Sequence, residues 1–388
     1  MQPLKLVIEG EFWDSQIYSG RLYLFKSDGS IKTVDWDMLI NKWKLKKSLH
    51  LPMTCAYSNS QYLYSSKFKK FFGDREVKTL IQDKFKRLSQ ENLFIPTKKL
   101  DSYLCGQQDN LFPFPHSDCT IYNRIIYVGA KDGIFSASCG KNTKKPVSTR
   151  LTKENDIPAL SLSPNYGNLA VAAGDEGLCQ IPVNNSFYEN NAVRKLSKKN
   201  CVGCSWNYES IYGSSHIDEG VLADFSYNRD EERRRFNKLY FQSQIFKKKQ
   251  LGYSWGAQDK ICLASKNKIS VVRYSSYSED EKLQFLGEFT MDAWKGKIVS
   301  AGVALFGNVV ECDNAMVVFP SEGHAINIPG EPVNWRIFPR ARNYENHLHI
   351  VYEDRLEIYS FNHDYFVDQD QKISGFRAPK SYFRKKYR

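Results

Sequence analysis

The chain lacks any apolar run long enough to cross a membrane, and its first residues lack the apolar stretch that a secretory signal peptide requires. Common catalytic motifs are also missing: there is no GxSxG, no phosphate-binding P-loop and no HExxH. These absences predict a protein with no membrane contact, no catalytic residues and no cofactor. They favour a cytoplasmic location, with the nucleus as the alternative if the source is eukaryotic.

Cysteine is present, but not in the pattern of a disulfide or metal framework. The nine cysteines are odd in number and irregularly spaced, and several, such as Cys179 and Cys262, lie within apolar strands. They indicate reduced, buried thiols. Cys201 and Cys204 form a CxxC pair without the second pair that a zinc ribbon needs, so we expect no metal site.

Histidine is scarce and scattered. His347 and His349 project to the same side of one expected strand, but two ligands are too few for a metal site. We therefore expect a pair on the strand surface. The acids Asp28, Asp132 and Asp175 each lie beside a turn glycine, where short polar side chains favour turn geometry rather than catalysis.

What the chain does have is a short unit of strands, most clearly at residues 157–181. Leu160 and Leu162 alternate with serines, as in a half-buried strand, and Pro164 begins a turn. The compact apolar run at residues 169–173 and the strand beyond it are joined by residues 174–177, Gly-Asp-Glu-Gly. One such unit cannot bury both of its faces, so it needs copies beside it.

Copies of this unit run along the chain. An apolar strand, a turn and an alternating strand recur at residues 22–36, 125–137, 261–272, 316–328 and 348–359, with weaker copies at 61–65 and 210–225. The strong copies are spaced by roughly 40 to 50 residues, the length of a four-stranded propeller blade. In this pattern the chain resembles the WD40-like β-propeller family over nearly its whole length. It departs from the family in one respect. Asp35-Trp36 lies where the third strand of a blade would end, but the family's Trp-Asp and Gly-His pairs do not recur from blade to blade.

The resemblance implies an all-β fold with a single closed propeller at residues 1–372, most simply of seven blades. Eight blades, a β-sandwich or two small β domains are the alternatives. It also implies that an N-terminal strand at residues 4–8 completes the last blade beside residues 356–361, which would close the ring. Residues 373–388 would form a basic, aromatic tail that contains no acid.

One segment breaks the strand rhythm. Residues 66–90 predict a short helical insertion in or after the second blade, with Val77, Leu80, Ile81, Phe85 and Leu88 at helical spacing. Basic side chains lie on the opposite face. A helix that covers the propeller wall is favoured over an element that binds a partner.

The net charge of +12 and the pI of about 9.1 indicate attraction to nucleic acid, acidic proteins or anionic surfaces. Basic clusters follow several blades, among them Lys195, Lys198 and Lys199, and also Arg336, Arg340 and Arg342. If they share one rim, they would bind phosphates without reading bases. The candidate contacts for a partner or for phosphate are Arg233, Arg234, Arg235, Lys247, Lys248, Lys249, Arg377, Arg384, Lys385, Lys386 and Arg388.

A rigid propeller with variable loops is typical of a recognition platform. We therefore expect a non-catalytic scaffold or recognition subunit that binds one or more proteins in a larger complex. The alternative is a nucleic-acid-binding subunit that uses the basic rim. An enzyme with its active site at the mouth of the central channel is the least favoured class.

Overall fold

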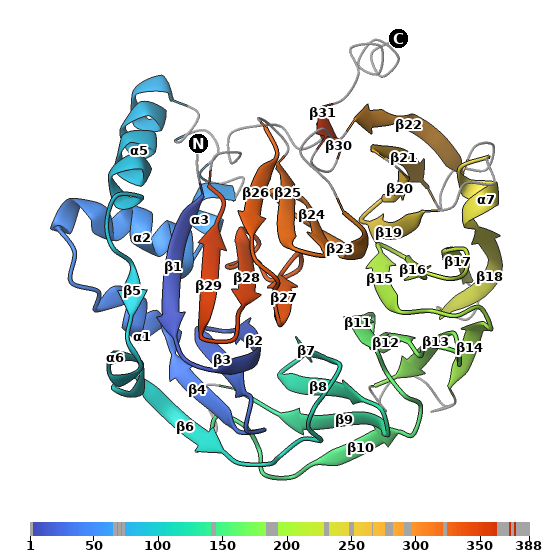
Figure 1. Ribbon diagram of the computed structural model, residues 1–388, viewed down its shortest axis with the longest axis horizontal. Coiled ribbons are helices and arrows are strands. Elements are labelled where there is room, and N and C mark those ends of the chain that lie inside the picture. The colour runs from blue at the N-terminus through green and yellow to red at the C-terminus, as the bar shows by residue number, and fades with distance from the viewer. Residues whose placement is uncertain are drawn as a thin grey trace.

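The computed structural model shows seven β-sheets arranged around one axis as a propeller (Figure 1). The structure describes residues 3–64, 68, 71, 74–140, 145–183, 193–228, 233–247, 252–265, 267–275, 282–290, 296–320, 324–362, 372–373 and 376–377. The expected all-β propeller with seven blades is confirmed, and the eight-bladed and sandwich alternatives are wrong.

Each blade is a sheet of at least four strands, named here from the axis outward. The first three in chain order are β2 (Phe12–Tyr18), β3 (Arg21–Lys26), β4 (Ile31–Asp35) and β6 (Leu104–Gln108); β7 (Asp118–Tyr122), β8 (Ile125–Ala130), β9 (Gly133–Ser138) and β10 (Thr152–Asn155); and β11 (Ser161–Asn165), β12 (Asn168–Ala172), β13 (Leu178–Pro182) and β14 (Arg194–Ser197).

The next three blades follow the same order. They are β15 (Gly203–Asn207), β16 (Ser210–Ser214), β17 (Val221–Asn228) and β18 (Arg233–Phe241); β19 (Tyr253–Ala257), β20 (Lys260–Ser265), β21 (Lys268–Tyr274) and β22 (Leu283–Thr290); and β23 (Ile298–Ala304), β24 (Gly307–Cys312), β25 (Ala315–Pro320) and β26 (Ile326–Pro329).

The last blade joins the two ends of the propeller sequence. It contains β27 (Asn334–Ile337), β28 (His347–Val351), β29 (Arg355–Ser360), the N-terminal strand β1 (Leu4–Glu9) and the short β5 (Phe94–Ile95). β1 pairs antiparallel with β29 from Leu4 opposite Ser360 to Glu9 opposite Arg355. The expected closure by the N-terminal strand is therefore confirmed, and it removes the edge that β29 would otherwise expose.

The unit at residues 157–181 forms β11, β12 and β13, as expected. Leu169 to Ala172 are fully buried because sheets pack against both faces of β12. The turn between β12 and β13 depends on Gly177, which has a φ of +92°. A Cβ atom at this position would lie 2.1 Å from the carbonyl oxygen of Ser197. A side chain there would collide with the main chain of the neighbouring strand.

Most of the other expected copies are also strand pairs, including residues 210–225, which contain β16 and the start of β17. One local expectation is wrong, because residues 61–64 form the short helix α3 (Gln61–Tyr64) rather than a strand. A second short helix, α7 (Gln242–Ile245), follows β18. Short apolar runs of this kind do not distinguish helix from strand until their neighbours are known.

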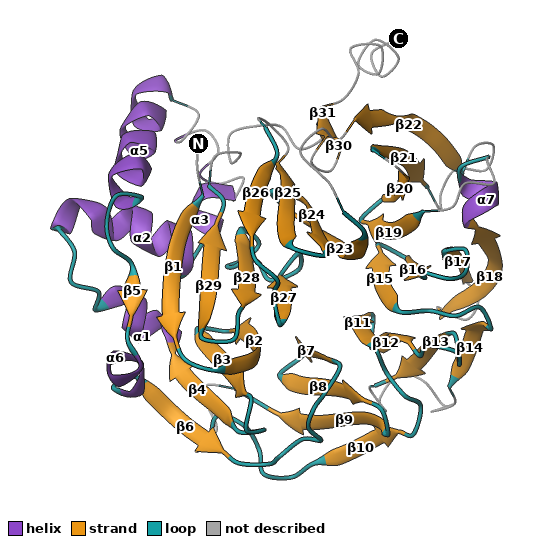
Figure 2. Cartoon of the chain, viewed as in Figure 1, coloured by secondary structure: helices purple, strands orange, loops and turns teal. Residues whose placement is uncertain are grey.

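The expected helical insertion is confirmed and is longer than residues 66–90. Helices separate β4 from β6 and gather on one side of the ring (Figure 2). They are α1 (Trp36–Asn41), the 3-10 turn η1 (Lys47–Leu49), α2 (His50–Tyr57), α3, α5 (Arg75–Leu88) and α6 (Thr97–Asp101). We call residues 36–103 the helical insertion.

Helix α5 packs on α2 and η1, so it belongs to the layer of helices beside the ring (Figure 1). Asp74 caps its first turn by accepting from the backbone N–H groups of residues 76 and 77. Ile81, Phe85 and Leu88 are buried in the same apolar cluster as β1 and β29, while Leu80, expected on the apolar face, is 56% exposed. Within the described part of the chain, no helix is long and apolar enough to cross a membrane.

Candidate functional site at the propeller axis

The inner strand of the last blade carries an arginine that binds two other blades. Arg336 on β27 donates from Nε to Asp14 Oδ1 on β2 at 2.8 Å, and its two terminal nitrogens reach Asp14 and Asp118, the latter on β7. Asp118 also accepts from the backbone N–H of Leu162 on β11 at 2.6 Å. Four consecutive inner strands are thus joined by one polar network.

Burial alone would raise the pKa of Asp14, but the charge and hydrogen bonds of Arg336 and His116 outweigh it and hold that pKa well below its usual range. Burial also opposes the charge on Arg336, and Asp118 and Asp14 reverse that effect and raise its pKa well above the usual value. The pair is therefore ionised in the folded state, and each charge depends on the other.

Three buried side chains in this network, Asp14, His116 and Cys119, have possible metal-ligating atoms within 4.8 Å of one another. They do not fit a metal ion, because the guanidinium of Arg336 already neutralises Asp14. The thiol of Cys119 donates to Asp14 Oδ2 at 3.1 Å, and burial raises its pKa well above the usual value, which keeps it protonated. The cluster is a satisfied ion pair with a thiol donor, and it contains no activated nucleophile.

A second arginine lies just beyond β27. Arg340 has its Nη2 3.4 Å from Ser163 Oγ on β11, and Ser163 Oγ in turn accepts from the backbone N–H of Trp206 on β15 at 3.2 Å. β27 and β11 are three blades apart, the widest separation that a ring of seven allows. The side chain of Arg340 therefore crosses the propeller axis.

Aromatic side chains lie on the same face as this crossing point. Tyr122 ends the inner strand β7, and Tyr166 and Tyr208 lie in the turns that follow β11 and β15, so all three belong to one face of the propeller. Tyr122 and Tyr166 are close enough to Arg340 to act on its charge. Tyr166 and Tyr208 are 44% and 59% exposed. The Tyr166 ring meets Trp206 edge to face, with centroids 5.7 Å apart. We call Arg340, Ser163, Tyr122, Tyr166 and Tyr208 the axial site.

Ion pairs overturn part of the basic-rim hypothesis. Arg336 forms an internal ion pair with Asp14 and is not a cation of the rim, and Lys195 and Lys199 are paired with Glu176 and Asp218. The sequence also contains a pattern that identifies Asp14 and Asp118, the two acids that bind Arg336, and our sequence-based expectations did not use it. Both begin the same five-residue pattern, Asp-x-x-Ile-Tyr, at residues 14–18 and 118–122, on two neighbouring inner strands.

The expected surface pair of histidines is wrong. His347 and His349 do project to one side of β28, but both are completely buried, because the end of α2 and the loop at residues 338–346 cover them. His347 Nε2 lies 2.9 Å from the carbonyl oxygen of Ala56, and His349 Nδ1 lies 3.0 Å from Ser15 Oγ. The histidines therefore connect the helical insertion and β2 to the last blade.

The candidate partner contacts do not gather in one place within the described chain. Arg233, Arg234 and Arg235 begin β18, the outermost strand of its blade, and the side chain of Arg235 is exposed. Lys247 is exposed beyond α7, and Arg377 lies in the short strand β31 (Phe376–Arg377), which pairs with β30 (Lys372–Ile373). The others, Lys248, Lys249, Arg384, Lys385, Lys386 and Arg388, lie outside the described residues.

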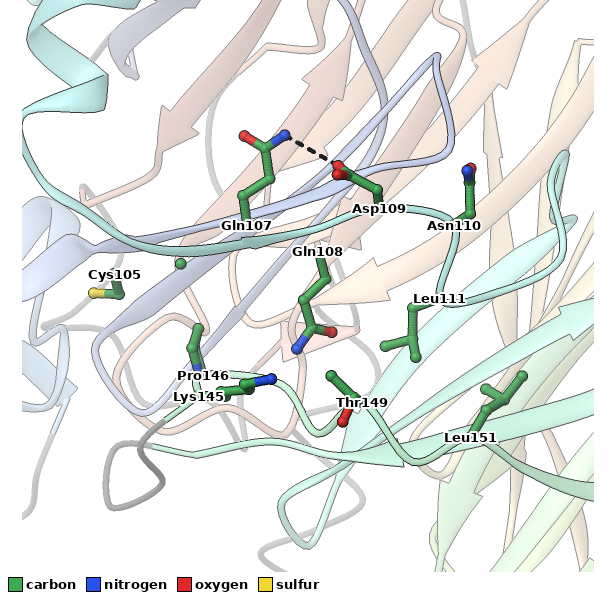
Figure 3. Close-up of a pocket in the computed structure, with 11 residues that line it drawn as sticks. Cys105, Gln107, Gln108, Asp109, Asn110, Leu111, Lys145, Pro146, Thr149 and Leu151 are labelled. Carbon is green, nitrogen blue, oxygen red and sulfur yellow. Dashed lines mark hydrogen bonds between the residues drawn. The ribbon is translucent and has the colours of Figure 1, made fainter.

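The expectation of buried thiols holds for Cys179 and Cys262. Cys201 is buried and Cys204 half-buried, and the Cys204 thiol bonds to backbone oxygens of Ser161 and Ala170. Cys105 is exposed. It lines a groove of about 520 Å³ between the outer strand β6 and residues 145–151 of the next blade (Figure 3). Gly106 allows this close approach, since a Cβ there would lie 2.7 Å from Pro146.

The sequence matches no protein-family model, and a search of curated proteins finds no match. Among solved structures, a chain from the crystal structure of a mitotic checkpoint complex is 9% identical, with a TM-score of 0.44 over 68% of this chain and 80% of that chain. The β-propeller domain of Myceliophteria thermophila Cps50 (Swd1) is 12% identical, with a TM-score of 0.40 over 64% of this chain and 98% of that chain. Similarity at this level gives no information about the function of this chain. The resemblance to WD40-like propellers holds at the level of fold, through the seven blades of four or five strands and the pairing of β1 with β29.

Proposed function

We propose that this protein is a non-catalytic β-propeller that binds partner proteins within a larger assembly, and that the helical insertion is a main contact surface. The observation that carries the proposal is the distribution of charge. Residues 36–103 contain fourteen Lys and Arg against six Asp and Glu, which is +8 of the chain's +12. Residues 1–35 and 104–372 together contain 35 basic and 37 acidic residues, so the rest of the propeller is close to neutral.

The helical insertion is held rigidly, as a preorganised binding surface should be. The carbonyl oxygen of Ala56, at the end of α2, accepts hydrogen bonds from Asn346, His347 and Ser360 of the last blade. Trp36 Nε1 donates to the carbonyl oxygen of Tyr57, and the Trp36 ring is completely buried. The insertion thus spans the first and last blades in chain order.

The outer face of α5 combines positive charge with exposed apolar area. Arg75, Lys86 and Arg87 are exposed, and Leu80 lies among them on the same helix. Charges of one sign around an apolar contact favour a protein partner of opposite charge, because they speed the encounter and the apolar group supplies affinity. The expected partner therefore presents an acidic surface with an apolar centre.

The test begins with the partner that copurifies with the full-length chain from its native host, measured afterwards with purified components. Replacement of Arg75, Lys86 and Arg87 with glutamate should weaken that binding at least tenfold. The matched control carries the same charge change at the exposed residues Lys131, Arg194 and Lys198 on other blades and should bind normally. Equal effects of the two triple variants would contradict the proposal.

The nucleic-acid alternative is retained because the same +8 region could contact phosphates. Fluorescence anisotropy with duplex and single-stranded probes at two salt concentrations separates the two proposals. Micromolar binding that collapses at the higher salt, and that the α5 charge reversal abolishes, would favour nucleic acid. The absence of binding at low salt would remove this alternative.

A further inference from the structure

We propose that the axial site binds a single carboxylate from an acidic segment of a partner protein, with Arg340 as its cationic anchor. This inference rests on the proposed interaction function, but it uses different residues from the exposed face of α5. It starts from a contrast between two arginines that lie four residues apart. Arg336 is bound by two carboxylates, whereas no carboxylate of the described chain pairs with Arg340.

The surroundings of Arg340 are unfavourable for a cation. Burial lowers the pKa of its guanidinium, and the groups that act on its charge in the opposite direction are Tyr122, Cys204 and Tyr166. None of these is an aspartate or a glutamate, and burial raises the pKa of the Cys204 thiol well above its usual value. The desolvation of Arg340 is therefore left without a compensating anion inside the described chain.

Arg340 is nevertheless accessible. Its residue is exposed to solvent, although protein surrounds it closely enough to disfavour its charge. Its one side-chain hydrogen bond within the described residues, to Ser163 Oγ, is long at 3.4 Å, so most of the five guanidinium donors remain available to a ligand. A planar carboxylate can accept two of them at once, which is the geometry that arginine binds best.

The tyrosines define the rest of the ligand. Tyr122 Oη accepts from the backbone N–H of Gly167 at 3.1 Å, so its own proton is directed elsewhere and can be donated. Tyr166 and Tyr208 present exposed rings on the same face, where they can cover the aliphatic or aromatic neighbours of the acidic residue. The site thus matches a peptide with one acidic residue flanked by apolar residues.

Charge argues against a polyanion at this position. The chain outside the helical insertion and the residues after 372 is close to neutral, so Arg340 does not belong to a part of the chain with the excess of positive charge that nucleic acids and phosphopeptides require. One arginine balances one carboxylate. We therefore assign the ligand to a glutamate or aspartate side chain rather than to a phosphate group.

The test uses the full-length protein and three fluorescein-labelled decapeptides that differ only in the central residue, which is glutamate, glutamine or phosphoserine. The flanking residues are tyrosine and leucine, followed by glycine and serine. We expect the glutamate peptide to bind in fluorescence anisotropy and the glutamine peptide to bind at least tenfold more weakly. Tighter binding of the phosphoserine peptide, or no binding of the glutamate peptide up to millimolar concentration, would overturn the assignment.

Two variants locate the binding. Arg340→Gln should reduce the affinity for the glutamate peptide at least tenfold, whereas Arg342→Gln, two residues further along the same exposed loop, should leave it unchanged. Equal losses would overturn the role of Arg340. Thermal unfolding of Arg340→Gln should match that of the parent, because the 3.4 Å contact to Ser163 is weak.

The α5 charge-reversal variant separates this inference from the proposed function. It should lose the copurifying partner's contact with the insertion and still bind the glutamate peptide. If the partner binds through α5 while no peptide binds at Arg340, the inference fails and the proposed function stands. If the peptide binds and no α5-dependent partner exists, the axial site stands without the insertion surface.

Discussion

The imidazole of His347 and the carbonyl oxygen of Ala56 form a buried hydrogen bond of 2.9 Å that joins the last blade to the helical insertion. A carbonyl only accepts, so Nε2 of His347 carries the proton and the neutral ring has its Nδ1 unprotonated. Burial lowers the pKa of His347 from 6.5 to about 4, with a smaller opposing effect from this hydrogen bond. Burial and the neighbouring His347 also lower the pKa of His349.

This bond predicts a specific loss of stability in mild acid. Below pH 6.5 the unfolded chain protonates His347, whereas the folded chain does so only near pH 4, so the free energy of unfolding falls as the pH drops through that window. By pH 5.0, which is 1.5 pH units below the pKa of the unfolded state, the loss from this group is on the order of 2 kcal/mol. Urea unfolding at pH 7.5 and 5.0 measures it. Replacement of His347 with glutamine should reduce the difference, and an unchanged pH dependence would contradict the explanation.

A second prediction concerns Arg336. Replacement of Arg336 with methionine leaves two carboxylates near the axis without their cation, and should destabilise the fold by about 3–5 kcal/mol. Adding Asp14→Asn and Asp118→Asn to that variant should restore most of the loss, because no buried charge then remains unpaired. Chemical denaturation measures each variant. If the single and triple variants are equally unstable, the charges are not the cause.

A third prediction tests the closure of the ring. Ile8 on β1 is completely buried in the cluster that includes β29 and α5, so Ile8→Ala should cost about 2–5 kcal/mol. Val7, its neighbour on the opposite face of the strand, is only half-buried, and Val7→Ala should cost clearly less. Differential scanning calorimetry provides the comparison. Similar losses at the two positions would mean that β1 is not seated as described.

The turn at residues 174–177 offers a comparison between two glycines. Gly174 has φ +59° with only a Leu160 methyl group near a Cβ, so alanine there should cost about 1 kcal/mol. At Gly177 alanine would collide with the carbonyl oxygen of Ser197, and the cost should be several times larger. Thermal melts of the two variants rank them. The reverse order would refute the described turn.

A fifth prediction uses cysteine chemistry. Cys105 is exposed, whereas the other eight thiols are buried or half-buried, and burial raises the pKa of, for example, Cys201 to about 12 and Cys312 to about 11. Ellman's reagent should therefore modify one thiol rapidly in the folded protein and the rest only after unfolding. Cys105→Ser should abolish the rapid phase. Fast modification of several thiols would show a more open core.

Much of the fold could be predicted from the sequence because each blade is formed largely by residues that are close together in the chain. The alternation at residues 161–163, the apolar run at 169–172 and the turn after it lie within about twenty residues, and each reports its own strand. The helix α3 was misassigned since its four residues carry no period long enough to decide. The site was less accessible, because Arg336 binds Asp14, 322 residues away.

By itself, the sequence determined the repeat of short strands, the all-β class and the helix at residues 75–88. These depend on periodicity and turn residues, which act between near neighbours. Only the tertiary structure decided which arginine is neutralised and which crosses the axis without an acid partner in the described chain. It also decided that two histidines are buried rather than exposed. Those outcomes depend on which strands the closed ring places next to or opposite one another. Local sequence does not determine those contacts, because the residues that make them are far apart in the chain.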